Sequence, residues 1–113
     1  MIKLLLQVEF LRVFVGESDH YGGKLLYEAI IQEARSRGMA GATALRGLMG
    51  FGAHSRLHTA KVLRLSEDLP IVVEIVDTSE KIQDLLPKLD EMIEEGLVTL
   101  ERVRVITYRH QQL

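Results

Sequence analysis

Residues 45–58 (LRGLMGFGAHSRLH) place glycines among side chains that are, or can become, positively charged. Glycine lets the backbone adopt positive φ and brings its N–H groups close to a ligand, an arrangement that binds anions. Guanidinium groups bind phosphate oxygens in pairs, and imidazole becomes cationic near neutral pH. The run therefore predicts a site for a phosphate-bearing anion. Its candidate contacts are Arg46, Gly47, Gly50, Phe51, Gly52, His54, Arg56 and His58.

Residues 45–58 are also compatible with other interpretations. A glycine-rich turn without a ligand would contain the same residues. A P-loop is excluded, because no Lys-Ser or Lys-Thr follows the spacing from Gly47 to Gly52. His54 and His58 are four residues apart and could ligate a metal together with His20 or Asp19. Exposed loop histidines are commoner than metal ligands, so no metal site is predicted.

A second turn, residues 16–23, carries polar side chains between glycines. Glu17 and Asp19 could hold a bound cation or cap the helix that follows. Nucleophilic catalysis would need Ser18 or Ser55 beside a histidine and a buried carboxylate, and nothing in the spacing singles out such a set. No catalytic residue is predicted, and the protein is not expected to be an enzyme.

Composition narrows the classes of protein to which this chain could belong. A chain of 113 residues supports one hydrophobic core, so residues 1–113 are expected to form a single domain. The net charge of −2 lacks the basic surplus of nucleic-acid-binding domains, so no such partner is predicted. With no cysteine, disulfides and thiolate sites are excluded. No apolar run approaches the ~20 residues of a membrane span, and a cytoplasmic protein is expected.

Hydrophobic periodicity predicts the elements that must position these residues. Apolar residues at helical spacing before Gly38 and after Asp77 predict two helices. Asp77-Thr78-Ser79-Glu80 is expected to supply the N-cap of the second helix, with Glu80 in the capping-box position if Asp77 is the cap. Pro87 is expected to kink or divide that helix. Strands are predicted at 4–15, 42–46, 71–76 and 97–108, with a short extended arm at 62–66.

This βαββαβ order predicts an α+β fold of the ferredoxin-like type, with a four-stranded antiparallel sheet and two helices on one face. In that topology the segments 16–23, 47–70 and 94–97 meet at one end of the sheet. The other face would expose apolar residues, because a small domain has no further element to cover it. A homo-oligomer is therefore expected.

The chain also resembles a known family. The motifs that carry the resemblance lie between about residues 10 and 109: Gly16-Glu17-Ser18-Asp19, Gly23-Lys24, Leu26-Tyr27-Glu28-Ala29, Gly41-Ala42-Thr43, Arg46-Gly47, Gly50-Phe51-Gly52, His58, and Leu69 to Asp77. They are similar to those of an uncharacterised bacterial and archaeal family grouped with the PII-like (GlnB-like) signalling proteins. Members are often linked with fluoride-exporter genes, which implies a role in ion homeostasis.

The resemblance implies a trimer that binds adenine nucleotides in clefts between subunits and needs no cofactor. It implies that residues 47–70 act as a partner-binding switch, the partner being a membrane transporter or a regulatory protein. True PII proteins carry a modifiable tyrosine in this loop, which is absent here, so regulation by uridylylation is not carried over. The expected ligand contacts then also include Glu17, Ser18, Asp19, Thr43, Arg102 and Arg104.

Arg102 and Arg104, with Arg109, would reach the phosphate across a subunit boundary, although a solvated strand face would contain the same arginines. Two other classes of function stay open. One is a small enzyme acting on a phosphorylated or carboxylated substrate, with His54 or His58 as acid or base. The other is a purely structural oligomer.

Overall fold

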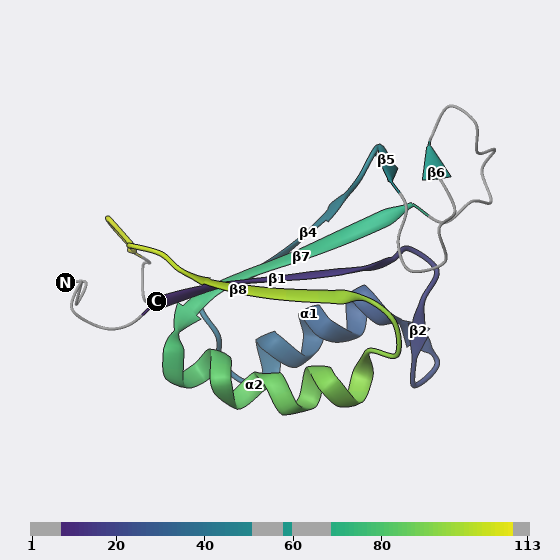
Figure 1. Cartoon of the computed structure of the whole chain (residues 1–113). Coiled ribbons are helices and arrows are strands. Elements are labelled where there is room, and N and C mark those ends of the chain that lie inside the picture. The colour runs from purple at the N-terminus through teal and green to yellow at the C-terminus, as the bar shows by residue number, and fades with distance from the viewer. Residues whose placement is uncertain (1–7, 51–57, 60–68, 110–113) are drawn as a thin grey trace.

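The protein folds into a four-stranded antiparallel sheet with two helices on one of its faces, as Figure 1 shows. The structure is a computed structural model of the chain and describes residues 8–50, 58–59 and 69–109. The sheet order is β4-β7-β1-β8. This confirms the predicted ferredoxin-like α+β fold. Its main elements are β1 (Val8–Gly16), α1 (Leu26–Ser36), β4 (Ala42–Arg46), β7 (Pro70–Thr78), α2 (Ser79–Met92) and β8 (Leu97–Arg102).

Two short hairpins supplement the sheet. The first pairs β2 (His20–Tyr21) with β3 (Lys24–Leu25). It turns at Gly22 and Gly23, which both have positive φ, the conformation that tight two-residue hairpin turns require. The second pairs β5 (Met49–Gly50) with β6 (His58–Thr59). The sequence predicted turns in these segments, but not the strand pairing.

The core lies between the sheet and the helices. Alternate residues of the two central strands point into it, because successive side chains of a strand face opposite sides. Val13 and Val73 are paired across β1 and β7, and both are fully buried. The largest fully buried side chains are Leu11, Val13, Ile30, Val73, Ile75, Ile82, Leu85 and Leu89.

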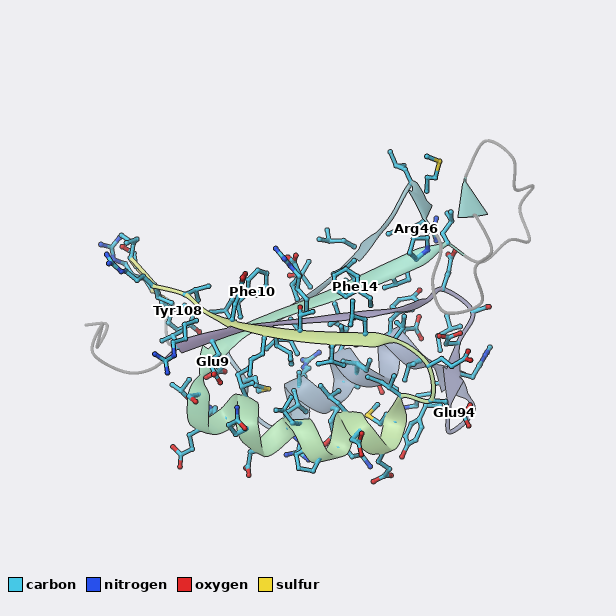
Figure 2. All side chains as sticks on the ribbon, in the orientation of Figure 1. Glu9, Phe10, Phe14, Arg46, Glu94 and Tyr108 are labelled. Atoms are coloured by element: carbon cyan, nitrogen blue, oxygen red, sulfur yellow. The ribbon has the colours of Figure 1, made fainter. Side chains whose placement is uncertain are left out.

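No helix of the described residues covers the opposite face of the sheet, and we call it the helix-free face. Figure 2 shows Phe10 and Phe14 pointing away from the helices. The strand register places Phe14 beside Val72 and Leu97, and Phe10 beside Val76. The residues that the register places on this face include Phe10, Arg12, Phe14, Thr43, Leu45, Val72, Glu74, Val76, Leu97, Thr99 and Glu101.

The end of α1 agrees with the sequence. Gly38 has a φ of 71°, and its N–H donates to the Arg35 carbonyl at 3.0 Å, while the Met39 N–H donates to the Ala34 carbonyl at 3.2 Å. These bonds satisfy carbonyl groups that the helix leaves unpaired at its end. The prediction that Gly38 stops this helix is confirmed.

The N-cap of α2 lies within the predicted stretch 77–80, at its second residue. Thr78 is the N-cap, and its Oγ1 accepts from the Lys81 N–H at 3.3 Å. Asp77 is still part of β7, where it is paired with Glu9, and its carboxylate accepts from the Ala40 and Thr78 amides at 2.8 and 2.7 Å. Because strand pairing extends β7 through Thr78, Asp77 is not the cap, and the capping box that it would have made with Glu80 does not form.

Two further boundaries differ from the predictions. Pro87 does not divide α2, which runs from Ser79 to Met92; burial of Leu85 and Leu89 on either side of it offsets the hydrogen bond that proline cannot donate. The last strand ends at Arg102 and does not continue to 108; the next amide, the Val103 N–H, donates to the carbonyl of Val8, the first described residue of β1, at 3.2 Å. The predicted arm at 62–66 and the predicted strand start at residues 4–7 lie outside the described residues.

Candidate functional site

The three segments predicted to meet at one end of the sheet do meet there. The Glu17 N–H donates to the Leu69 carbonyl at 2.8 Å, which joins the turn after β1 to the start of β7. The Gly47 N–H donates to the Pro70 carbonyl at 2.7 Å, which joins the end of β4 to the same point. This confirms the topological prediction, and we call this end of the sheet the junction.

The segment between α2 and β8 also reaches the junction. A Cβ atom on Gly96 would lie 2.6 Å from the Phe14 carbonyl oxygen, a distance that real Cβ atoms essentially never show. Glycine at position 96 therefore lets this segment approach the end of β1. In Figure 2, Glu94 lies at the same end of the molecule as Arg46.

Arg46 and Glu17 form an ion pair across the junction. The Arg46 guanidinium donates to the Glu17 carboxylate, and 58% of the arginine side chain and 25% of the glutamate side chain are exposed. Arg46 ends β4, and Glu17 follows β1, so the two residues come from strands that are not neighbours in the sheet. The pair places a positive group at the base of the segment after β4.

Asp19 stabilises the turn after β1 through hydrogen bonds. Its Oδ2 accepts from the Gly16 N–H at 2.9 Å, its own N–H donates to the Gly16 carbonyl at 3.2 Å, and its carbonyl accepts from the Leu26 N–H at 2.7 Å. Neither Asp19 nor Glu17 caps α1, whose N-cap Leu25 makes no side-chain hydrogen bond. The helix-capping alternative was therefore wrong. Ser18 is exposed in the same turn.

The glycines of the junction act differently from the prediction. Gly47 and Gly50 are not among the glycines with positive φ. Their Cβ positions would lie 2.8 and 3.2 Å from the Pro70 side chain, so glycine is needed for close packing against Pro70. The Gly47 N–H is already hydrogen bonded and cannot donate to a phosphate. The Gly47 amide therefore cannot contribute to the expected amide cradle.

Three predicted contacts lie away from Arg46 within one chain. Thr43 is on the helix-free face, paired with Glu74. Arg102 is paired with Glu9 near the start of β1, whereas Arg46 lies in register with its far end. Six residues of strand separate these levels, about 20 Å at the usual rise. Arg104 follows beyond the end of β8.

Other predicted contacts fall outside the described residues. These are Phe51, Gly52, His54 and Arg56; for His58 the structure gives only its backbone in β6. Among residues 8–50, 58–59 and 69–109, no three His, Asp or Glu residues gather as a metal site would require. Sequence reasoning missed Pro70 as the residue on which the junction packs, although a proline at the start of a strand is a recognisable signal.

A second polar cluster, also unpredicted, holds the β2–β3 hairpin against α2. The Tyr21 hydroxyl donates to the Glu91 carboxylate at 2.5 Å, and the Lys88 ammonium lies 3.2 Å from that carboxylate and 3.5 Å from the Tyr21 oxygen. The hydrogen bond from Tyr21, then that from Lys88, lowers the pKa of Glu91. The bond to Glu91, then that to Tyr21, raises the pKa of Lys88.

No helix in the part of the chain that the structure describes is long and apolar enough to cross a bilayer.

The fold is that of the PII-like proteins. CPII, a nitrogen regulatory PII-like protein from Thiomonas intermedia K12, matches with a TM-score of 0.63 over 91% of this chain and 92% of its own, at 18% identity, in a structure bound to ADP, AMP and bicarbonate. A second CPII structure, bound to ADP and bicarbonate, matches with a TM-score of 0.56 over 91% and 93% of the two chains, again at 18% identity.

Within this class, the chain belongs to the DUF190 family, described as "Uncharacterized ACR", whose profile matches residues 8–105. A UPF0166 protein of Aquifex aeolicus is 38% identical over 87% of this chain and 92% of its own length. A UPF0166 protein of Methanocaldococcus jannaschii is 33% identical over 85% and 89%. These matches confirm the resemblance to an uncharacterised PII-like family.

Proposed function

We propose that this protein is a PII-like regulator that binds an adenine nucleotide, or a related phosphorylated small molecule, with Arg46 as a phosphate contact. The observation that carries the proposal is the exposed guanidinium of Arg46 at the junction, where the turn after β1 and both ends of the segment between β4 and β7 are hydrogen bonded together. The ADP-bound CPII structures, which share this fold, support the choice of ligand.

A homo-oligomer, a trimer in our proposal, would cover the helix-free face. Leu45 and Leu97 on this face are 48% and 57% exposed, and an apolar face of this kind favours association. Arg102 lies about 20 Å from Arg46 along the sheet and Arg104 follows beyond the end of β8, so they would contribute to the site of another copy rather than to their own. The binding site would then be a cleft between subunits.

The response to the ligand would pass through residues 47–70. Most of this segment lies outside the described residues, so the proposal rests on its described ends, Gly47 and Pro70, which are joined at the junction. A ligand held at Arg46 would contact the base of the segment directly. The partner that we propose is a regulatory protein or a membrane transporter, and the protein itself would act in the cytoplasm without a required cofactor.

We propose a binding protein rather than an enzyme, because the described side chains of the junction hold one another or the backbone. Arg46 binds Glu17, and Asp19 binds the Gly16 amide. Such contacts position groups but do not prepare a nucleophile.

Calorimetric titration with ATP, ADP, AMP and cyclic nucleotides tests the proposal. We expect binding of at least one of them, and we expect Arg46→Ala to weaken it by about 1.5 to 3 kcal/mol, the range for a charged hydrogen bond. Arg35→Ala, which removes an arginine from the last turn of α1, is the control and should bind as the wild type does. The absence of both heat and a thermal shift at millimolar nucleotide would contradict the proposal.

A further inference from the structure

We infer that Glu17 is an internal competitor for phosphate: its carboxylate occupies the Arg46 guanidinium, and a phosphate-bearing ligand binds Arg46 by displacing it. Glu17 therefore lowers the affinity of the site and is not itself a ligand contact. The inference rests on the proposed function for the role of Arg46 as a phosphate contact.

The backbone holds Glu17 in place. Its N–H is bonded to the Leu69 carbonyl at 2.8 Å, and the turn that it begins is closed by the Asp19 carboxylate, which accepts from the Gly16 N–H at 2.9 Å. Three quarters of the Glu17 side chain is covered. The carboxylate is thus presented to Arg46 by a structured turn and does not need to be recruited from solvent.

Arg46 is the partner that can move. It is the last residue of β4, an edge strand of the sheet, and more than half of its side chain is exposed. An arginine side chain has several rotatable bonds and can turn its guanidinium toward solvent at little steric cost. In an exchange, the arginine would leave Glu17 and the turn after β1 would stay where it is.

Arg12 and Arg37, which also form ion pairs, each have a second anchor beside their carboxylate. Arg12 binds Glu74 at 3.3 Å and also stacks on the Phe10 ring, 4.4 Å from its centroid. Arg37 binds Glu33 at 2.7 Å and also donates to the Asp84 carbonyl at 3.2 Å. For Arg46, the ion-pair partner within the same described ranges is Glu17. This difference makes the junction pair the most readily exchanged of the three.

The chemistry of the exchange favours phosphate over carboxylate. Both anions bind a guanidinium through two parallel hydrogen bonds, so a phosphate oxygen pair fits the geometry that Glu17 now fills. A diphosphate carries more negative charge than a single carboxylate and gains more from the cation. An exposed ion pair is weak, so its loss costs the fold little, yet every anion that uses Arg46 must overcome it.

Titration with pyrophosphate, and separately with ADP, tests the inference on wild type and on Glu17→Gln. The substitution keeps the shape of the side chain and removes its charge. We expect both ligands to bind about 2- to 5-fold more tightly, which is the fold-change that corresponds to a weak exposed ion pair. Glu33→Gln, which breaks the Arg37 pair on α1, is the matched control for the loss of one negative charge and should leave both affinities unchanged.

The double variant Glu17→Gln/Arg46→Gln separates competition from a general change in charge. If Glu17 acts through Arg46, the gain disappears in the double variant. Unchanged or weaker pyrophosphate binding by Glu17→Gln, or a gain that persists without Arg46, would overturn the inference. Circular dichroism melting of each variant establishes that it is folded.

The two ligands distinguish failure of this inference from failure of the proposed function. If Glu17→Gln binds pyrophosphate more tightly than the wild type does, and neither protein binds ADP, the competitor role is supported and nucleotide binding is contradicted. ADP binding by the wild type without a gain for either ligand in Glu17→Gln supports nucleotide binding and overturns the competitor role.

Discussion

The two faces of the sheet are built from alternate residues of the same strands, yet their environments are opposite. On the helix-covered face, Val73 is fully buried, whereas its neighbour Val72, on the helix-free face, is only half-buried. Arg12 and Glu74 form an ion pair at the centre of the helix-free face, and the Arg12 guanidinium lies over the Phe10 ring. Figure 2 shows the helices on one side and Phe10 and Phe14 on the other.

This difference in burial indicates what each face of the sheet contributes to the protein. On the first face the helices bury the central strands β1 and β7, where Leu11, Val13, Val73 and Ile75 are at most 1% exposed, so this face stabilises the single chain. The second face combines aromatic side chains with one ion pair, and this mixture of apolar core and polar contacts is typical of interfaces between subunits. We therefore assign folding to the first face and, as part of the proposed function, assembly to the second.

The largest expected effect compares Val73→Ala with Val72→Ala. Removing two methyl groups from the fully buried Val73 should lower the free energy of unfolding by about 2 kcal/mol, because the cavity cannot be filled by its neighbours. The same change at Val72 should cost less than about 1 kcal/mol. Urea denaturation at a protein concentration that keeps the assembly state constant measures both. Equal losses would show that the two faces do not differ.

A second test concerns assembly. Phe14→Ser places a hydroxyl at the centre of the helix-free face, beside Val72 and Leu97, and should dissociate the proposed oligomer to protomers of 12.8 kDa. Light scattering after size-exclusion chromatography measures the mass. Leu48→Ser is the control: Leu48 is 81% exposed but lies outside the sheet, so its loss should leave the mass unchanged. A mass for Phe14→Ser that equals the wild-type mass would contradict the assignment of this face.

The smallest expected effect is on the helix-covered side, where Tyr21, Lys88 and Glu91 attach the β2–β3 hairpin to α2. The pKa of Glu91 is lowered from 4.5, so its contribution to stability is present above that value and is lost as the pH falls through the folded pKa. The pKa of Lys88 is raised from 10.5, so its contribution is present below that value and is lost as the pH rises through the folded pKa.

Melting temperatures measured across this pH range test the cluster. The wild type should lose a few degrees below about pH 4.5 and again above about pH 10.5, relative to neutral pH. Glu91→Gln should lower the melting temperature at neutral pH and reduce both losses, because Lys88 and Tyr21 then lack their charged partner. Glu94→Gln, two residues past α2, should keep the wild-type profile. If the melting temperature of Glu91→Gln changes with pH in parallel with that of the wild type, the cluster does not contribute to the pH dependence of stability.

Much of the fold could be predicted because it follows from local pattern. The alternation of Ile71, Val73 and Ile75 identifies β7 and its buried face. Gly38 identifies the end of α1 because its positive φ is costly for other residues. The boundaries at Thr78 and Arg102 could not be predicted, since they depend on which residues pair with β1 across the sheet.

The candidate site, like the fold, could be predicted only in part from the sequence. The sequence alone placed the segments after β1 and β4 at one end of the sheet, because the order of elements and the antiparallel pairing fix which loops meet. It also suggested Arg46 as the cation of that end.

Only the tertiary structure decided what these residues do there. Gly47 and Gly50 pack against Pro70, and Arg46 binds Glu17, a residue 29 positions away in the chain. Such contacts depend on strand register and on the direction of each side chain at the end of its strand. Periodicity fixes the face on which a residue lies, but the partner that it meets across the sheet is set by the packing of the whole chain.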